Sequence, residues 1–317
     1  MIVIPKKEIE QISQQIIQDA VKDAYMLMAK GEFNMPDRQH VSDKENTLLL
    51  MPCFSNDYFV TKLVSLFPGA SEFGQPSISG IVVLNDNKTG QPLAIIDGAA
   101  LTAQRTGAVG GLAIRYMTPE TLETAGLIGA GVQGYHQARY LCFNRKIKTL
   151  YIYDLVKKNA VAIMEQLKKE IDEVSFHICS DPIELVQSSG AVIAATTSYS
   201  PLFDAAPDQL SGKTFISIGS FQPEMREFPD TVIETSDAVF ADTLFACKES
   251  GDLAIPIKAK KLDKNVVTPF SDIFEKPVKS GQTLFFKSVG MALFDLMTAV
   301  RVFELAKKNG LGTQIEI

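Results

Sequence analysis

Residues 124–144 read TAGLIGAGVQGYHQARYLCFN, so that an apolar run, a glycine-rich turn and a helical pattern follow one another directly. The apolar run 124–128 predicts a buried strand, and residues 133–144 predict a helix. Between them, Gly129, Gly131 and Gly134 form a G-x-G-x-x-G pattern. This pattern is weak evidence alone, but a strand before it and a helix after it are typical of a dinucleotide-binding Rossmann unit.

We expect each of the three glycines to have a different structural role in such a turn. Gly129 allows the tight turn, Gly131 lets the backbone approach a pyrophosphate, and Gly134 lets the helix pack closely on the strand. The start of the helix offers unpaired N–H groups and a favourable dipole to the phosphates. We therefore predict that the whole turn binds the cofactor: Gly129, Ala130, Gly131, Val132, Gln133 and Gly134. A turn that only reverses the chain is the alternative.

The residue after the next strand bears on the choice of cofactor. The strand 150–153 ends at Asp154, twenty residues beyond Gly134. A carboxylate at this place can accept both ribose hydroxyls and repels a 2′-phosphate, which favours NAD(H). Lys157 and Lys158 lie close enough to leave NADP(H) as an alternative. A helix-capping role for Asp154 is compatible with ribose binding.

Six apolar segments after Pro119 predict a parallel sheet with helices on both faces. The predicted strands are 124–128, 150–153, 175–178, 191–195, 214–218 and 238–241, and the helices between them include 133–144 and 158–170. Ligands of such sheets lie beyond the carboxyl ends of the strands. We therefore add the small residues there to the predicted cofactor site, although ordinary turns are the alternative: Thr196, Thr197, Ser198, Gly219 and Ser220.

The segments outside the predicted parallel sheet have different hydrophobic patterns. Residues 8–30 predict an amphipathic helix that ends at Gly31, and residues 47–51, 59–66, 79–84 and 92–97 predict strands. Helices are expected at 99–117 and at about 288–309. The predicted fold class is α/β, with a Rossmann doubly wound parallel sheet (119–286) inserted in an α+β substrate-binding and dimerisation domain (1–118 plus 287–317).

Composition excludes several classes of protein. A chain of 317 residues with 46% hydrophobic and 21% charged residues fits a two-domain globular protein. The net charge of −6 argues against a nucleic-acid surface, and we see no apolar run of about 20 residues that could span a membrane. Four widely spaced cysteines without a CxxC motif and three histidines predict neither a disulfide framework nor a metal site. With no signal-peptide pattern, we expect a cytoplasmic protein.

Three cationic residues stand in unusual surroundings. Lys62 lies inside an apolar strand, Arg105 lies near the start of a helix rich in Ala and Gly, and Arg38 follows Pro36-Asp37. Lysine and arginine are mostly surface residues, but this placement favours a site for an anion. A guanidinium group can bind a carboxylate through two parallel charge-assisted hydrogen bonds.

Together these motifs make the chain resemble the ornithine cyclodeaminase/mu-crystallin family over nearly its whole length. The matching segments are 36–38, the Lys62 strand, 105–108, 129–137, 195–198 and 286–290. The resemblance implies that Arg38 and Arg105 hold a substrate carboxylate, Lys62 contacts the reacting end and acts in catalysis, and Thr106 assists with a cofactor phosphate. It also implies a homodimer formed through the first domain. We assign further substrate contacts to Met51, Phe221, Ser288, Val289 and Gly290.

Two departures from the family pattern bear on the reaction. Phe221 stands where members that cyclise ornithine carry an aspartate, and Leu49 replaces a second acid two residues before Met51. A distal ammonium would then lack partners, and an unpaired buried charge is costly. We predict little or no ornithine cyclodeaminase activity, and instead NAD(P)H-dependent reduction of a cyclic ketimine, Δ1-pyrroline-2-carboxylate or Δ1-piperideine-2-carboxylate. Phe221 would pack on a ring of the substrate or nicotinamide, or else belong to the domain core. An alanine or other amino-acid dehydrogenase and a non-catalytic binding protein remain alternatives.

Overall fold

The computed structural model describes residues 1–316, which form two compact units. Unit 1 contains residues 1–105 and 291–316, and unit 2 contains Thr106–Gly290. The predicted domain limits, 118/119 and 286/287, follow the ends of expected helices and strands. The compact units instead divide the chain inside helix α3 (Gly98–Met117) and after the loop 288–290.

Unit 2 is built on a parallel sheet, as predicted. Its order is β13-β12-β14-β11-β10-β7-β8-β9, and every neighbouring pair is parallel. The strands are β7 (Thr124–Ile128), β8 (Thr149–Tyr153), β9 (Ser175–Ile178), β10 (Ala191–Ala194), β11 (Thr214–Ser217), β12 (Ala238–Ala241), β13 (Val267–Pro269) and β14 (Leu284–Lys287). The prediction missed β13 and β14, and β14 lies between β11 and β12 in the sheet interior.

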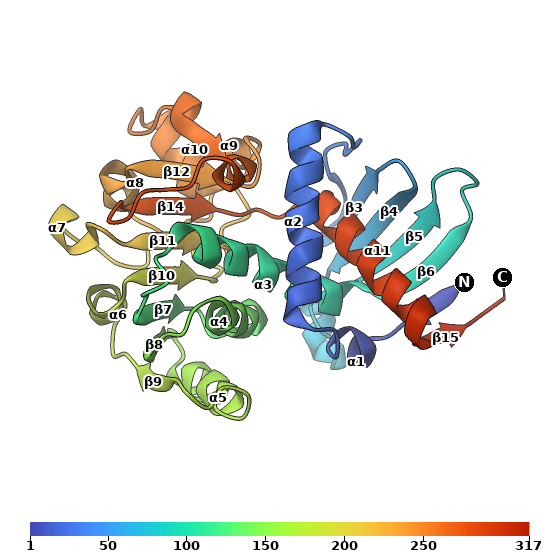
Figure 1. Cartoon of the computed structure of the whole chain (residues 1–317), viewed down its shortest axis with the longest axis horizontal. Coiled ribbons are helices and arrows are strands. Elements are labelled where there is room, and N and C mark those ends of the chain that lie inside the picture. The colour runs from blue at the N-terminus through green and yellow to red at the C-terminus, as the bar shows by residue number, and fades with distance from the viewer. Residues whose placement is uncertain (317) are drawn as a thin grey trace. The chain divides into compact units, whose positions relative to one another are not determined.

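Helices alternate with these strands along the chain (Figure 1). They are α4 (Val132–Asn144), α5 (Lys157–Leu167), α6 (Pro182–Ser188), α7 (Pro207–Leu210), α8 (Asp230–Thr235), α9 (Ala246–Glu249) and α10 (Gly251–Lys258), with short 3-10 helices η2 (Lys264–Val266) and η3 (Phe270–Phe274). The predicted helix 158–170 ends earlier, at Leu167. Because strand–helix–strand crossovers are right-handed, α4 and α5 cover one face, and α6 covers the other as the chain returns to β10.

The direction of strand order reverses next to β7. From β7 the chain adds β8 and β9 on one side of the sheet, and it then returns to place β10 and β11 on the other side. In a doubly wound sheet, ligands bind at the carboxyl ends of the strands that flank such a reversal. The topology therefore predicts a ligand-binding site at the carboxyl ends of β7, β8 and β10.

Unit 1 holds a mixed sheet in the order β15-β1-β6-β5-β4-β3-β2. Its strands are β1 (Ile2–Ile4), β2 (Gln39–Asp43), β3 (Asn46–Phe54), β4 (Tyr58–Leu66), β5 (Ile78–Asp86), β6 (Pro92–Asp97) and β15 (Thr313–Gln314), with the 3-10 helix η1 (Pro68–Phe73) after β4. The β1–β6 pair is parallel and the other pairs are antiparallel. The helices are α1 (Lys6–Ile9), α2 (Gln14–Lys30) and α11 (Ala292–Asn309), of which α2 and α11 pack against each other (Figure 1).

Two predicted helix limits in unit 1 are wrong. Residues 8–30 form two helices rather than one, because the chain leaves the helical conformation before Ser13, whose extended backbone precedes α2. The last helix begins at Ala292 rather than at residue 288, because Met291 is extended and residues 288–290 form a loop. The predicted C′ position of Gly31 is confirmed by its left-handed φ of 70°.

Candidate active site

A cavity of about 630 Å³ lies at the carboxyl ends of β7, β8 and β10 in unit 2. Strand ends supply Gly129 and Gly131 after β7, Asp154 after β8, and Thr196–Ser198 after β10. The cavity thus opens where the strand order reverses. Many of the residues predicted to bind a cofactor therefore come together from three separate segments of the chain.

The glycine turn has the geometry that its spacing predicts. Gly129 adopts a φ of 99°, which L side chains rarely adopt, and a Cβ there would lie 2.6 Å from the carbonyl oxygen of Ala195. A Cβ on Gly134 would lie 2.0 Å from the carbonyl oxygen of Gly129. By contrast, a Cβ on Gly131 would meet no atom within 4 Å. Gly131 lines the cavity at the start of α4, so its open backbone fits an approaching phosphate.

Asp154 lines the same cavity and is held by the backbone on both sides. Its Oδ2 accepts a hydrogen bond from the N–H of Ala130 at 2.8 Å, and its Oδ1 accepts one from Val156 at 2.8 Å. The first bond joins the end of β8 to the glycine turn. Asp154 therefore stabilises the turn from within the cavity, and this cavity-lining carboxylate fits a ribose.

Thr106 lies on α3, and its backbone is tied to the helix that follows the glycine turn. The Gln137 amide on α4 donates a hydrogen bond to the Thr106 carbonyl at 2.8 Å, and both residues are buried. The helices approach so closely that a Cβ on Gly107 would lie 2.6 Å from the Tyr140 ring. The Ala- and Gly-rich composition of 98–117 thus serves close packing against α4.

Unit 1 contains a buried ionic cluster that joins two of the predicted substrate residues. Lys62 on β4 and Arg105 on α3 both donate to Oδ1 of Asp295 on α11, through Nζ at 3.1 Å and Nε at 3.1 Å. All three side chains are buried. Asp295 was not predicted, although a lone acid beside the apolar residues Leu293, Phe294 and Leu296 of one helix could have signalled it.

The charges in this cluster shift one another's pKa values. Burial above all, together with the charges of Arg105 and Arg38, lowers the pKa of Lys62 from 10.5 to about 8 against the opposing effect of Asp295. Burial by itself raises the pKa of Asp295, but Arg105 and Lys62 outweigh that effect and hold it below its ordinary value. One carboxylate thus pairs with two cationic side chains, which leaves an excess of positive charge.

Other predicted residues of the substrate site occupy varied surroundings. Met51 is buried on β3 directly opposite Lys62 on β4, and Leu49 lies on the same face of β3 two residues earlier. The interpretation of Phe221 as domain core is wrong, because this side chain is 40% exposed after β11. Positions 49 and 221 are leucine and phenylalanine, so neither side chain offers a carboxylate.

The loop 288–290 is held by Asp242, a buried residue that was not predicted. Its Oδ2 accepts hydrogen bonds from the Ser288 hydroxyl at 2.6 Å and from the N–H groups of Val289 and Gly290 at 3.0 Å each. These polar groups therefore already have partners within unit 2. A substrate contact by this loop remains a prediction and would depend on its other atoms.

Two further predicted cofactor residues, Thr196 and Gly219, bind the buried carboxylate of Glu227. Glu227 was not predicted, since one glutamate between Arg226 and Phe228 gives no periodic signal. Ser220 is buried beside them, and its hydroxyl donates to the Met225 carbonyl at 2.6 Å.

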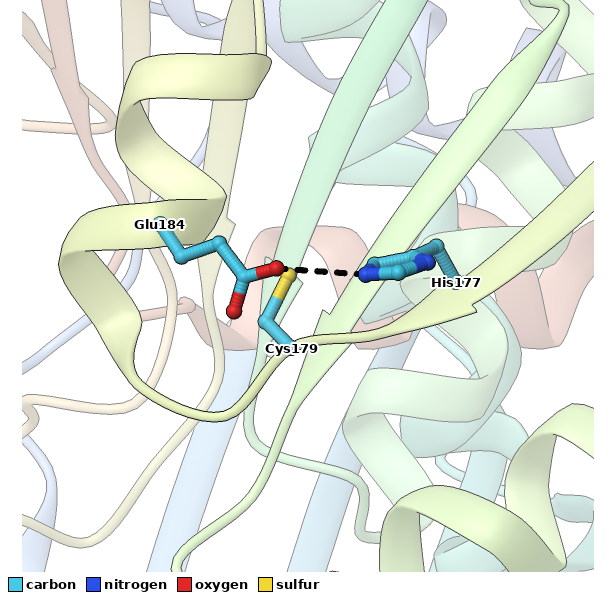
Figure 2. A group of neighbouring side chains, drawn as sticks. All are labelled: His177, Cys179 and Glu184. Atoms are coloured by element: carbon cyan, nitrogen blue, oxygen red, sulfur yellow. Dashed lines mark hydrogen bonds and ion pairs between the residues drawn. The ribbon is translucent and has the colours of Figure 1, made fainter.

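A separate group of potential metal ligands lies at the end of β9, as Figure 2 shows. His177, Cys179 and Glu184 each place one ligand atom within 4.8 Å of the others, and His177 Nε2 is 3.2 Å from Glu184 Oε1. The other Glu184 oxygen already accepts from the N–H and hydroxyl of Ser180. Burial, together with the charges of Glu184 and Asp181, raises the pKa of the Cys179 thiol to about 12. Hydrogen bonds with His177 and Ser180 account for the position of the Glu184 carboxylate.

Comparison with known proteins gives one family and several similar structures. A model described as the ornithine cyclodeaminase/mu-crystallin family matches residues 4–310. A Delta(1)-pyrroline-2-carboxylate reductase of Bacillus cereus is 29% identical over 283 residues, which cover 87% of this chain and 86% of that protein. Two solved structures have a TM-score of 0.91 to this fold.

The two solved structures differ in their ligands. The Delta(1)-pyrroline-2-carboxylate reductase of Thermococcus litoralis, in complex with NADH and L-proline, is 29% identical, with 99% of this chain and 100% of that chain covered. An archaeal alanine dehydrogenase dimer with bound NAD is 25% identical, with coverage of 100% and 99%. Within residues 1–316, no helix combines the length and apolar character needed to cross a membrane.

Proposed function

Because the chain belongs to the ornithine cyclodeaminase/mu-crystallin family, we propose that it reduces Δ1-pyrroline-2-carboxylate to L-proline with NADH. The six-membered Δ1-piperideine-2-carboxylate is the proposed second substrate. The observation that carries this proposal is the buried cluster of Lys62, Arg105 and Asp295, in which positive charge exceeds negative charge.

A bound carboxylate would neutralise the excess charge of this cluster. Asp295 holds Arg105 through Nε, and among the residues that the structure describes it is the one hydrogen-bond partner of that side chain. The two Nη groups can therefore form a bidentate pair with the substrate carboxylate. Arg38 adds a third positive charge in range of Lys62. The site thus favours a small anion over a neutral amine.

Lys62 has the properties needed to manage a proton at the imine nitrogen. With a pKa of about 8 it is mostly protonated at neutral pH, yet it releases a proton more readily than an ordinary lysine. In the reaction, the imine carbon gains a hydride and the ring nitrogen carries a proton, so that C=N becomes CH–NH. Lys62, directly or through water, would keep that nitrogen protonated.

The residues of the cavity in unit 2 fit a dinucleotide, which would supply the hydride when bound. The open backbone of Gly131 would receive the pyrophosphate, and the Asp154 carboxylate would accept from the ribose hydroxyls. The negative charge of Asp154 would repel a 2′-phosphate, so we expect NADH to be preferred over NADPH. As part of the same proposal, we place the reaction in the cytoplasm, with the NAD(H) pool of the cell as its source of reductant.

A panel of substrates tests the function directly. We expect NADH oxidation with Δ1-pyrroline-2-carboxylate to exceed that with pyruvate plus ammonia, and ornithine with NAD to give little or no proline. The reason is that Leu49 and Phe221 offer no carboxylate to a distal ammonium. Absorbance of the reduced nicotinamide measures each reaction. Faster turnover of pyruvate plus ammonia would instead favour an amino-acid dehydrogenase, and rapid ornithine cyclisation would refute the proposal.

We also propose that the protein forms a homodimer through unit 1. Its sheet has one buried face, built from the rows Met51–Lys62–Val82–Ile96 and Cys53–Val60–Leu84–Ala94. The opposite face carries apolar side chains that are only partly buried or exposed, including Leu50, Phe59, Leu63 and Ile81. An apolar sheet face of this kind is typical of a protein–protein interface.

An arginine on that face should prevent association. We expect Ile81→Arg to convert the dimer to a monomer, because Ile81 is 40% exposed and pairs with Leu63 across β4 and β5. Sedimentation velocity measures the mass, and Val132→Arg, at an exposed position in unit 2, is the matched control. A wild-type protein that sediments as a monomer, or an Ile81→Arg protein that remains dimeric, would contradict the proposed interface.

A further inference from the structure

Glu227 is a fully buried carboxylate between β11 and α8, and its two oxygen atoms bind two different loops. Oε1 accepts hydrogen bonds from the backbone N–H of Thr196 at 2.6 Å and from its hydroxyl at 3.0 Å. Oε2 accepts from the N–H of Gly219 at 2.8 Å and of Ser220 at 3.3 Å. Thr196 follows β10 and Gly219 follows β11, so one carboxylate ties together the carboxyl ends of two adjacent strands.

The two loops are packed as closely as a glycine allows. A Cβ on Gly219 would lie 1.9 Å from the Thr196 carbonyl oxygen and 2.6 Å from Glu227 Oε1. Any side chain at Gly219 would therefore force the loops apart or displace the carboxylate. The absence of a side chain at this position is needed for the Glu227 bonds to form.

A second layer of buried groups fixes Glu227 itself. Asp252 Oδ1 accepts from the backbone N–H groups of Glu227 at 2.8 Å and Phe228 at 3.0 Å. Lys287 on β14 donates to the Ser217 hydroxyl at 2.8 Å, and this hydroxyl lies 2.7 Å from both carboxylates. Buried charges are costly unless they are paired and hydrogen-bonded. Here Lys287 lies among the two carboxylates, and hydrogen bonds hold Glu227 through both its backbone and its side chain.

We propose that Glu227 is a positioning residue for the nicotinamide half of the dinucleotide. This inference rests on the proposed function, since it presupposes a dinucleotide in the cavity of unit 2. In a doubly wound sheet the pyrophosphate binds at the glycine turn, and the adenosine ribose binds at the acid after the second strand, here Asp154. The loop after β10, which lines the cavity through Thr196–Ser198, is then left for the nicotinamide half. Glu227 acts on that half through Thr196, without touching the ligand.

Glu227→Gln separates this role from a general role in stability. The glutamine side chain has nearly the same size but one acceptor oxygen, so its amide nitrogen must face the N–H of either Thr196 or Gly219. One loop then loses its acceptor. We expect the Kd for NADH to rise about tenfold or more. The Kd for 5′-AMP, which occupies only the adenosine half, should change by less than about twofold.

Asp242→Asn is the matched control for this experiment. Asp242 is also a fully buried carboxylate of unit 2 that accepts from two backbone N–H groups and one hydroxyl, but the loop it holds, 288–290, does not line the cavity. The Asp242→Asn variant should leave the Kd for NADH within about twofold of wild type. Gly219→Ala provides a second route, because its Cβ should separate the Thr196 loop from the Glu227 carboxylate without any substitution of Glu227.

The measurements are NADH fluorescence titration, calorimetry with 5′-AMP, and thermal unfolding, all on the full-length protein. An unchanged Kd for NADH in Glu227→Gln would overturn the inference, and so would equal losses of NADH and 5′-AMP affinity. If Glu227→Gln does not fold, the same two ligands decide the matter with Gly219→Ala. Failure of the wild-type protein to bind NADH would refute the proposed function instead.

Discussion

Replacing Arg105 with alanine will lower kcat/KM for Δ1-pyrroline-2-carboxylate by roughly 30- to 4,000-fold. The variant removes one partner of a buried charge pair with the substrate, and such truncations cost about 2–5 kcal/mol. It also deprives Asp295 of its bond from Arg105 Nε. Steady-state kinetics with NADH held at saturation measure the loss.

The affinity for NADH distinguishes substrate binding from folding. Arg105→Ala should leave the Kd for NADH nearly unchanged, because the side chain belongs to unit 1 and the proposed dinucleotide cavity belongs to unit 2. Arg301→Ala, at a half-buried arginine on α11 that pairs with Asp23, is the control and should keep wild-type kinetics. Equal losses of substrate and NADH affinity in Arg105→Ala would assign Arg105 a role in folding instead.

Replacing Lys62 with methionine will reduce kcat by about 100- to 10,000-fold, the usual contribution of a positioned acid or base. Methionine keeps much of the apolar volume in the strand but cannot hold a proton, and Asp295 keeps its bond from Arg105. Lys88→Met, at an exposed lysine of unit 1 that pairs with Asp57, is the matched control. Near wild-type turnover by Lys62→Met would exclude Lys62 as the proton-managing group.

The pH dependence of the wild-type rate provides a second test of Lys62. Burial first, then the charges of Arg105 and Arg38, lower its pKa from 10.5 to about 8 against the opposing effect of Asp295. If the protonated form is the active one, kcat is constant below this pKa and falls as pH rises through about 8. Lys62→Arg, which stays charged, should retain its remaining activity above pH 8. A wild-type rate that stays constant to pH 10 would contradict this assignment.

Features that depend on local backbone chemistry could be predicted from the sequence. The run 124–144 contains its own strand, turn and helix signals, and the φ of 99° at Gly129 is a requirement of the turn itself. The parallel sheet followed from alternating apolar strands and helices. Lys62 and Arg105 stood out because a charge among apolar or small neighbours conflicts with ordinary burial preferences.

Residues that act through distant partners could not be predicted in this way. Asp295 joins Lys62 across 233 positions and Arg105 across 190 positions of the chain. Glu227 likewise binds Thr196 across 31 positions, and Asp242 binds Val289 across 47 positions. Each is a single acid whose separation in sequence from its partners follows no regular pattern. These residues become neighbours only when the helices and strands pack together. The break before Ser13 was missed for a related reason, since helical periodicity continues across it.

The sequence by itself determined the glycine-rich turn, the alternation of strands and helices, and the identity of the candidate cations, since these depend on neighbouring residues. The tertiary structure decided where β14 enters the sheet, which carboxylate pairs with Lys62 and Arg105, and which loops surround the cavity. The physical reason is that pairing of buried charges and the order of parallel strands are non-local. Their free energy comes from contacts between segments that no local pattern connects.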